Sequence, residues 1–274
     1  MMGRMFAGFR NAGTIRRDRP LTDDELKQVV PSVFSEEKHG SRSERYTYIP
    51  TISLLTRLRA EGFEPFYACQ QRVRDTDRID HAKHLLRLRR HDQIMGSEVS
   101  EILLLNSHDG SSSYQMIPGQ FRHICANGMV CGEVFGQIRV PHKGDIVGKV
   151  IEGAYEILDR FGEIEHSREE MKRIHLNRGE QAAFAETALE FRYDGQHVPI
   201  SAESLLQVRR REDNANDLWT VYQRTQENVI RGGIRGRTAK GALTKTRPIN
   251  GIDGDIKTNR FLWSLAEKMK ELKS

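Results

Sequence analysis

The chain has 274 residues, of which 37% are apolar and 30% charged, so it can bury a core beneath an unusually ionic surface. No stretch approaches the ~18–20 uninterrupted apolar residues that a membrane helix needs, and the N-terminal residues lack the apolar region of a secretory signal. A membrane span is therefore excluded, and three cysteines without a CxxC pair favour reduced thiols in the cytoplasm. The net charge of +5 is small, so the distribution of the charge matters more than its size.

In the first half of the chain, two helix signals precede a series of strand signals. Thr22 and Glu25 form a capping-box pattern that predicts a helix limited by Pro31, and a second helix is expected over 51–62. Apolar runs separated by turn residues, among them Asp109-Gly110 and Asn127-Gly128, then predict an antiparallel meander. The expected strands cover residues 66–74, 84–89, 101–106, 113–117, 121–125 and 134–140.

From Asp145 onward the apolar residues recur at helical spacing, with further helices expected over 179–191, 218–230 and from 257 to the end. The sequence therefore predicts an α+β fold, in which an antiparallel β-sheet meander covered by helices precedes a mainly helical C-terminal half. We expect a flexible N-terminal arm (1–19), a sheet domain (20–160) and a mainly helical region packed on it (161–274).

Two pairs of arginines on neighbouring predicted strands are the first candidate site. Arg72 and Arg74 are two residues apart, as are Arg87 and Arg89, so each pair points to one face of its strand. If the strands form a hairpin, four guanidinium groups share a face on which phosphates can bind, because the planar guanidinium donates two parallel hydrogen bonds. The alternative is a solvated face that is partly balanced by nearby aspartates.

A basic, glycine-rich segment over residues 228–252 is the second candidate site. Its cations are uninterrupted by any acidic residue, so the segment can follow a phosphate backbone and order on binding. The alternative is an exposed linker between two helices, with the preceding Trp219 and Tyr222 in the core. The six cations are Arg231, Arg235, Arg237, Lys240, Lys245 and Arg247.

Signals for enzyme chemistry are weaker. His81 and His84 lack a third metal ligand, the stretch 144–150 departs from a phosphate-binding loop, and no dinucleotide fingerprint is present. No cofactor, metal site or catalytic residue is predicted. Asp253 and Asp255 are the carboxylates that a metal-dependent nuclease would use, although an ordinary turn before the last helix is the favoured explanation for them.

Several sequence blocks spread over nearly the whole chain resemble one family. They are residues 19–26, 43–50, 105–119, 139–155, 216–219, 226–228 and 250–255. These blocks resemble uncharacterised proteins carried on bacterial plasmids and prophages, the group that contains YfjQ, YafZ and YubP of enterobacteria, within a broader domain of unknown function. The family commonly reads Cys-Thr-Asn-Gly where this chain has Cys125-Ala126-Asn127-Gly128, so a mechanism that needs a hydroxyl there is not expected. The resemblance implies a mobile-element setting and a soluble cytoplasmic protein.

Together these features favour a non-enzymatic protein that binds nucleic acid, with DNA, and single-stranded DNA in particular, as the expected partner. The layout of a meander followed by a helix also occurs in some single-strand annealing proteins, which is an analogy of fold alone. An inhibitor that binds a host defence protein is the alternative, because basic patches also bind acidic protein surfaces. The metal-dependent nuclease is a third hypothesis.

Overall fold

The computed structural model describes residues 13–35, 49–73, 76–92, 96–108, 113–123, 126–131 and 135–273. They fall into two compact units, one within Phe9–Gly162 and one within Glu163–Ser274, which we call the sheet unit and the helical unit. The predicted α+β class, with an antiparallel meander followed by a mainly helical half, is confirmed. In the part of the chain described, no helix combines the length and apolar character needed to cross a membrane.

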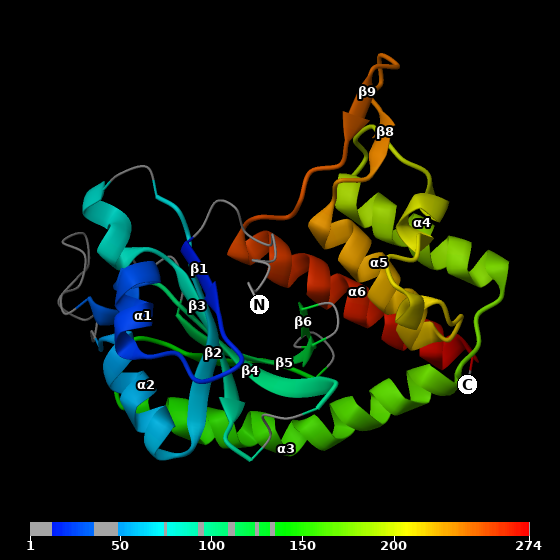
Figure 1. The fold of residues 1–274 in the computed structure, drawn as a ribbon. Helices are drawn as coiled ribbons and strands as arrows, with labels where there is room; N and C mark the ends of the chain where they lie inside the picture. Colours follow the sequence, from blue (N-terminus) through cyan, green and yellow to red (C-terminus); the bar gives the residue numbers. More distant parts are fainter. Residues whose placement is uncertain are drawn as a thin grey trace. The chain divides into compact units, whose positions relative to one another are not determined.

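The sheet unit is built on one antiparallel sheet of seven strands (Figure 1). The first six strands pair in chain order, and β5 pairs with β6 through its C-terminal part and with β7 through its N-terminal part. Strand β4 lies at the centre of this order and is buried along almost its whole length. The strands are β1 (Gly13–Arg16), β2 (Phe63–Gln70), β3 (His84–Arg90), β4 (Glu98–Asn106), β5 (Tyr114–Arg122), β6 (Asn127–Val130) and β7 (Ile138–Val140).

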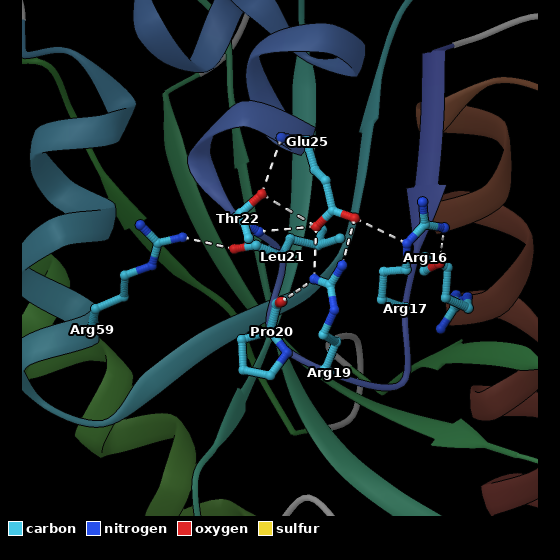
Figure 2. Close-up of polar contacts among 8 residues, drawn as sticks. All are labelled: Arg16, Arg17, Arg19, Pro20, Leu21, Thr22, Glu25 and Arg59. Atoms are coloured by element: carbon cyan, nitrogen blue, oxygen red, sulfur yellow. Dashed lines mark hydrogen bonds and ion pairs between the residues drawn. The ribbon is translucent and has the colours of Figure 1, made fainter.

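Helix α1 (Asp23–Val29) begins at the predicted capping box. The Thr22 hydroxyl accepts a hydrogen bond from the Glu25 amide at 3.3 Å, and the Glu25 carboxylate accepts one from the Thr22 amide at 3.1 Å. Figure 2 shows this exchange together with the arginines that also reach Glu25. Two amides that a helix start leaves without intrahelical partners are thereby satisfied, so this local sequence fixes where the helix begins.

Four further helical elements follow in the described part of the sheet unit, the last of which continues beyond it. Pro31 ends α1 and opens the short 3-10 helix η1 (Pro31–Phe34), and a second one, η2, spans Thr76–His81. Helix α2 (Thr51–Ala60) is the second predicted helix, and it buries its leucines. Helix α3 (Ile146–Arg173) begins in the sheet unit and ends in the helical unit.

The two faces of the sheet differ in chemistry because side chains alternate along each strand. One face is mainly apolar and contacts the helices: a Cβ on Gly153 of α3 would lie 3.2 Å from the Met116 sulfur of β5 (Figure 1). We call this the helix-covered face. The opposite face, which we call the arginine face, carries Arg16, Tyr67, Arg87, Arg89, Glu101 and Phe121.

Several predicted boundaries in the sheet unit need correction. Residues 13–16 of the expected flexible arm (1–19) form strand β1, paired with β2, whereas residues 1–12 lie outside the described part. The two strands expected over 113–117 and 121–125 are one strand, β5, which passes through Pro118. Pro118 lies between the part of β5 that pairs with β7 and the part that pairs with β6, and its carbonyl accepts a hydrogen bond from the Cys131 amide at 2.9 Å. The expected turn at Asp109-Gly110 lies outside the described residues.

The helical unit contains α4 (Arg178–Tyr193), α5 (Leu218–Arg231) and α6 (Ile252–Lys273), with the 3-10 helices η3 (Ala202–Leu206) and η4 (Arg211–Asp213). Its core includes Trp219, Tyr222 and Trp263, whose ring centroids lie 5.4–6.0 Å apart, so the core placement of Trp219 and Tyr222 is confirmed. Strands β8 (Arg235–Arg237) and β9 (Leu243–Lys245) form a hairpin that projects beyond α4 and α5 (Figure 1).

Candidate functional site

A buried ion cluster occupies the centre of the arginine face. The Glu101 carboxylate accepts a hydrogen bond from Arg89 Nε at 2.9 Å and another from Arg87 Nη1 at 3.1 Å. The three residues are at most 3% exposed. Arg87 and Arg89 do share a face of β3, as their spacing predicted, but this face is an interior one.

The exposed wall of four arginines expected from the sequence is therefore wrong. Arg87 and Arg89 are locked to a carboxylate that the sequence analysis did not consider. Strand β2 ends at Gln70, so Arg72 lies beyond the strand, and Arg74 lies outside the described residues. Because β2 carries no arginine pair in the paired part, the hairpin of β2 and β3 does not collect four guanidinium groups on one face.

A third arginine, Arg16 of β1, joins the cluster from the edge of the sheet. Its guanidinium carbon lies 4.6 Å from the centroid of the Tyr67 ring and 4.2 Å from that of Phe121, which is cation–π distance. Arg89 contacts the same Phe121 ring at 4.7 Å. Phe121 is thus in contact with two guanidinium groups.

Within the part of the chain that the structure describes, three guanidinium groups of this cluster accompany one carboxylate. Burial by itself raises the pKa of Glu101, but the attraction of Arg87, Arg89 and Arg16 outweighs it and lowers that pKa below its ordinary value. Burial lowers the pKa of Arg16 to about 10, against the opposing attraction of Glu101. Glu101 is therefore ionised at neutral pH, and the cluster carries an excess of positive charge.

The sequence makes room for the cluster with a glycine on the adjoining strand. A Cβ on Gly128 of β6 would lie 2.3 Å from the Arg87 guanidinium carbon. Asn127-Gly128 is consequently part of a strand and not the predicted turn, because the glycine serves the close approach of a neighbouring side chain.

A neutral polar network lies on the helix-covered face. The Thr51 hydroxyl at the start of α2 lies 2.9 Å from His84 Nε2 and 3.2 Å from His108 Nε2, while Ser32 Oγ lies 2.8 Å from His84 Nδ1. Burial lowers the pKa of His84 to about 4 and that of His108 to about 2. Both imidazoles are neutral at pH 7, so the network ties α2 and η1 to the sheet without charge.

The middle of the basic segment 228–252 forms the hairpin of β8 and β9. It is therefore not the flexible linker that its glycines suggested. Gly236 of β8 rests on the preceding loop, where a Cβ would lie 2.1 Å from the Pro199 carbonyl oxygen. The Arg237 amide donates a hydrogen bond to that same carbonyl at 2.9 Å. Across the hairpin Arg235 pairs with Lys245, so two cations stand opposite each other.

Five of the six predicted cations of this segment are exposed: Arg235, Arg237, Lys240, Lys245 and Arg247. Within the described residues, none of these five has a carboxylate at ion-pair distance. Arg231 differs, since it is half-buried at the end of α5 and pairs with Glu227 at 2.8 Å. We call the five exposed cations the basic hairpin.

A partly exposed aromatic pair lies beside the base of the basic hairpin. The rings of Phe191 in α4 and Phe261 in α6 are parallel, with centroids 3.8 Å apart. Lys257 Nζ lies 5.3 Å from the Phe191 centroid. The next residue, Arg192, donates a hydrogen bond to the Arg247 carbonyl at 3.2 Å, which connects this pair to the hairpin.

The carboxylates considered for a nuclease serve the fold of the helical unit. Asp253 and Asp255 lie in the first turn of α6, and Asp255 accepts a hydrogen bond from the Asn259 side chain at 3.2 Å. Asn259 in turn accepts one from Gln226 of α5 at 2.8 Å. Across the ranges that the structure describes, no three His, Cys, Asp or Glu side chains are grouped to hold a metal ion.

Sequence reasoning missed Arg16, Glu101 and the aromatic pair. Thr14-Ile15-Arg16 does alternate polar and apolar residues, which is a short strand signal, but it lies in an arginine-rich stretch. Glu101 begins an apolar run, where a lone acid indicates a buried partner of opposite charge. No local pattern brings Phe191 and Phe261 together, because they belong to different helices.

The comparisons with known proteins now bear on this architecture. Residues 38–263 match the family described as "Domain of unknown function (DUF932)". The chain is 59% identical over 268 residues to the UPF0380 proteins YfjQ and YafZ of Escherichia coli (strain K12), covering 98% of this chain and 98% of each relative. The chain belongs to the UPF0380 family of DUF932 proteins. No solved structure shows a significant match to this UPF0380 chain.

Proposed function

We propose that this protein is a non-enzymatic, nucleic-acid-binding accessory protein of a mobile genetic element, with single-stranded DNA as its ligand. The observation that supports this function is the basic hairpin, where five exposed cations, none with a carboxylate partner among the described residues, belong to the helical unit. Cations that are not neutralised within the protein can release the counterions of a phosphate backbone when they bind it.

The aromatic pair beside the hairpin supports single strands over duplex. Phe191 and Phe261 are partly exposed and flanked by Lys257, and Arg192 joins them to the hairpin strand. Unpaired bases stack on aromatic rings while the backbone follows nearby cations, whereas duplex bases are already stacked. The combination of cations and rings thus fits an unpaired strand.

The test is fluorescence anisotropy with a labelled single strand and the matched duplex at two salt concentrations. We expect the variant R235E/R237E/K245E to bind the single strand at least ~10-fold more weakly and to reduce the salt slope by about 2, since each phosphate contact on a single strand contributes ~0.7. The control R139E/K143E/K149E makes the same change in net charge with exposed cations of the sheet unit. Equal loss of affinity in the two variants would contradict a role for the hairpin.

A second double variant separates the contribution of stacking from that of charge. F191L/F261L keeps apolar side chains between α4 and α6 but removes the rings. We expect it to weaken single-strand binding ~10-fold with an unchanged salt slope and unchanged duplex binding, because stacking contributes about 1–3 kcal/mol per base. An equal loss of affinity for the single strand and the duplex, or no loss for either, would contradict the preference for single strands.

A further inference from the structure

The cluster on the arginine face contains one guanidinium nitrogen that is buried without a hydrogen-bond partner. The two oxygens of Glu101 accept hydrogen bonds from Arg89 Nε and from Arg87 Nη1. Arg16 contacts the rings of Tyr67 and Phe121, and its Nη1 is buried with no hydrogen-bond partner. A buried donor without an acceptor is costly, and a charged one more so, which makes this nitrogen an exception that calls for an explanation.

The groups that surround this nitrogen define the ligand that would satisfy it. Three guanidinium groups from two strands, β1 and β3, converge, and Arg89 Nη1 lies 3.5 Å from His123 Nε2 at the edge of the cluster. Guanidinium groups only donate hydrogen bonds, so the missing group must be an acceptor. Counted over the described residues, the three arginines exceed Glu101 by two positive charges, which matches a phosphate group with a charge of about −1.5 to −2 at pH 7.

Arg16 also gives such a group a way in. It stands on β1, at the edge of the sheet, and as a whole residue it is partly exposed although its Nη1 is buried. Its guanidinium is held by ring contacts, which are less directional than hydrogen bonds, so the side chain can shift toward an incoming anion. Arg87 and Arg89 are fixed by Glu101 and supply the rigid side of the site.

We propose that the arginine face of the sheet unit binds a phosphate group between Arg16 and the Arg87–Arg89 pair. The group is either inorganic phosphate or the terminal phosphate of a nucleotide, since both present the same oxygens. This site is separate from the basic hairpin and does not depend on the hairpin binding nucleic acid.

The decisive experiment measures thermal unfolding in millimolar sodium phosphate and in sodium chloride of equal ionic strength. We expect phosphate to raise the midpoint of the wild type by roughly 2 °C or more relative to chloride. R16Q should gain clearly less from phosphate than the wild type, and it should unfold at a higher temperature than the wild type in chloride, because it removes a buried donor that lacks a partner. Phosphate also stabilises proteins by exclusion from their surface, and R16Q measures that contribution.

Arg17 provides the matched control, since it is the next residue and bonds Glu25 at the surface. R17Q should keep the full increment from phosphate. The proposal is overturned if R16Q retains the increment of the wild type, or if wild type and R17Q gain nothing from phosphate.

The two sources of phosphate are distinguished with a short oligonucleotide, with and without a 5′-phosphate, in the R235E/R237E/K245E background. A gain of about threefold in affinity from the 5′-phosphate that is lost on adding R16Q assigns the site to a nucleotide end. An increment with inorganic phosphate alone assigns it to the free anion. Loss of the increment leaves the hairpin function untouched, and loss of hairpin binding leaves the increment untouched, so the two proposals fail separately.

Discussion

Two carboxylates of the sheet unit, Glu25 and Glu101, each gather arginines, and they differ almost only in burial. Glu25 accepts from Arg19 at 2.8 and 2.9 Å and from Arg17 at 3.0 Å, and these arginines are 57% and 49% exposed (Figure 2). Glu101 binds Arg87 and Arg89 in the interior, with Arg16 beside them. Among the described residues, the Glu101 cluster has one arginine more than the Glu25 cluster, and its Arg87 and Arg89 are buried, whereas water can solvate Arg17 and Arg19.

The pKa values of the two acids reflect this difference. The hydrogen bond from Arg19, aided by the Thr22 amide, lowers the pKa of Glu25 to about 2, and burial opposes this shift without being the largest influence. For Glu101, burial is the largest influence and raises the pKa, so the arginines must first overcome it. A surface ion pair contributes little to the free energy of unfolding, whereas removing one partner of a buried ion pair leaves an uncompensated charge in the interior.

The comparison predicts its largest effect for Glu101→Gln. This substitution keeps the shape of the side chain but leaves three buried guanidinium groups without a carboxylate, so we expect a loss of about 3–5 kcal/mol in the free energy of unfolding. Urea unfolding at pH 7 measures it. If Glu101→Gln lost no more free energy of unfolding than Glu25→Gln, burial would not distinguish the two clusters.

The pH dependence of stability separates the two faces of the sheet. The unfolded chain protonates His84 near pH 6.5, but the folded protein does so only near pH 4, because burial disfavours the charged ring. Stability is thus complete above pH 6.5 and falls as the pH drops toward 4, by ~1.4 kcal/mol per pH unit or about 3 kcal/mol in all. His108 acts in the same direction.

Glu101 enters this profile at lower pH. Its folded pKa lies below the ordinary value of 4.5, so its contribution is present above pH 4.5 and is lost only as the pH falls further. Urea unfolding at pH 7, 6 and 5 therefore reports the helix-covered face, and we expect His84→Gln to flatten that part of the curve. A wild-type protein equally stable at pH 7 and 5 would contradict the buried neutral imidazoles.

An intermediate effect is expected for Gly128→Ala. The added methyl group would lie 2.3 Å from the Arg87 guanidinium carbon and push it from Glu101, at a cost of about 1–3 kcal/mol. Gly162→Ala in α3 is the matched control, since a Cβ there meets nothing within 4 Å, and alanine should stabilise the helix by up to ~1 kcal/mol. Thermal unfolding of the two variants should shift in opposite directions, and equal shifts would show that Arg87 tolerates the intrusion.

The smallest effect is expected for Glu25→Gln. The amide can still accept hydrogen bonds from the Thr22 amide and from one arginine, and water solvates Arg17 and Arg19 when the carboxylate is gone. We expect the unfolding midpoint to change far less than in Glu101→Gln, and to change less still at high salt. A large destabilisation would mean that the surface cluster carries the fold after all.

Local patterns in the sequence predicted the helices well. Thr22 and Glu25 placed the start of α1, and the leucines of 51–62 placed α2, because capping and periodicity act over a few residues. The α+β class followed from the change of periodicity at Asp145. Strand ends were less accurate, since β5 continues through Pro118 on contacts made with β6.

The candidate sites were predictable only in part. The spacing of Arg87 and Arg89 gave their common face, but alternation does not say which face meets water, and the partner carboxylate is on another strand. Arg16 and the pair of Phe191 and Phe261 depend on contacts between distant segments. The hairpin cations were found because exposed charge without neighbouring acids is a property of the local sequence.

A substitution at Gly236 would separate the effect of the orientation of the basic hairpin from the effect of its charge. Because Gly236 has no side chain, strand β8 can lie against the Pro199 carbonyl, and even one added methyl group would displace the strand. A chain altered only there would keep every cation while presenting them at a different angle. Binding measurements on such a chain would reveal whether the ligand requires a particular orientation of the hairpin or only its electrostatic potential.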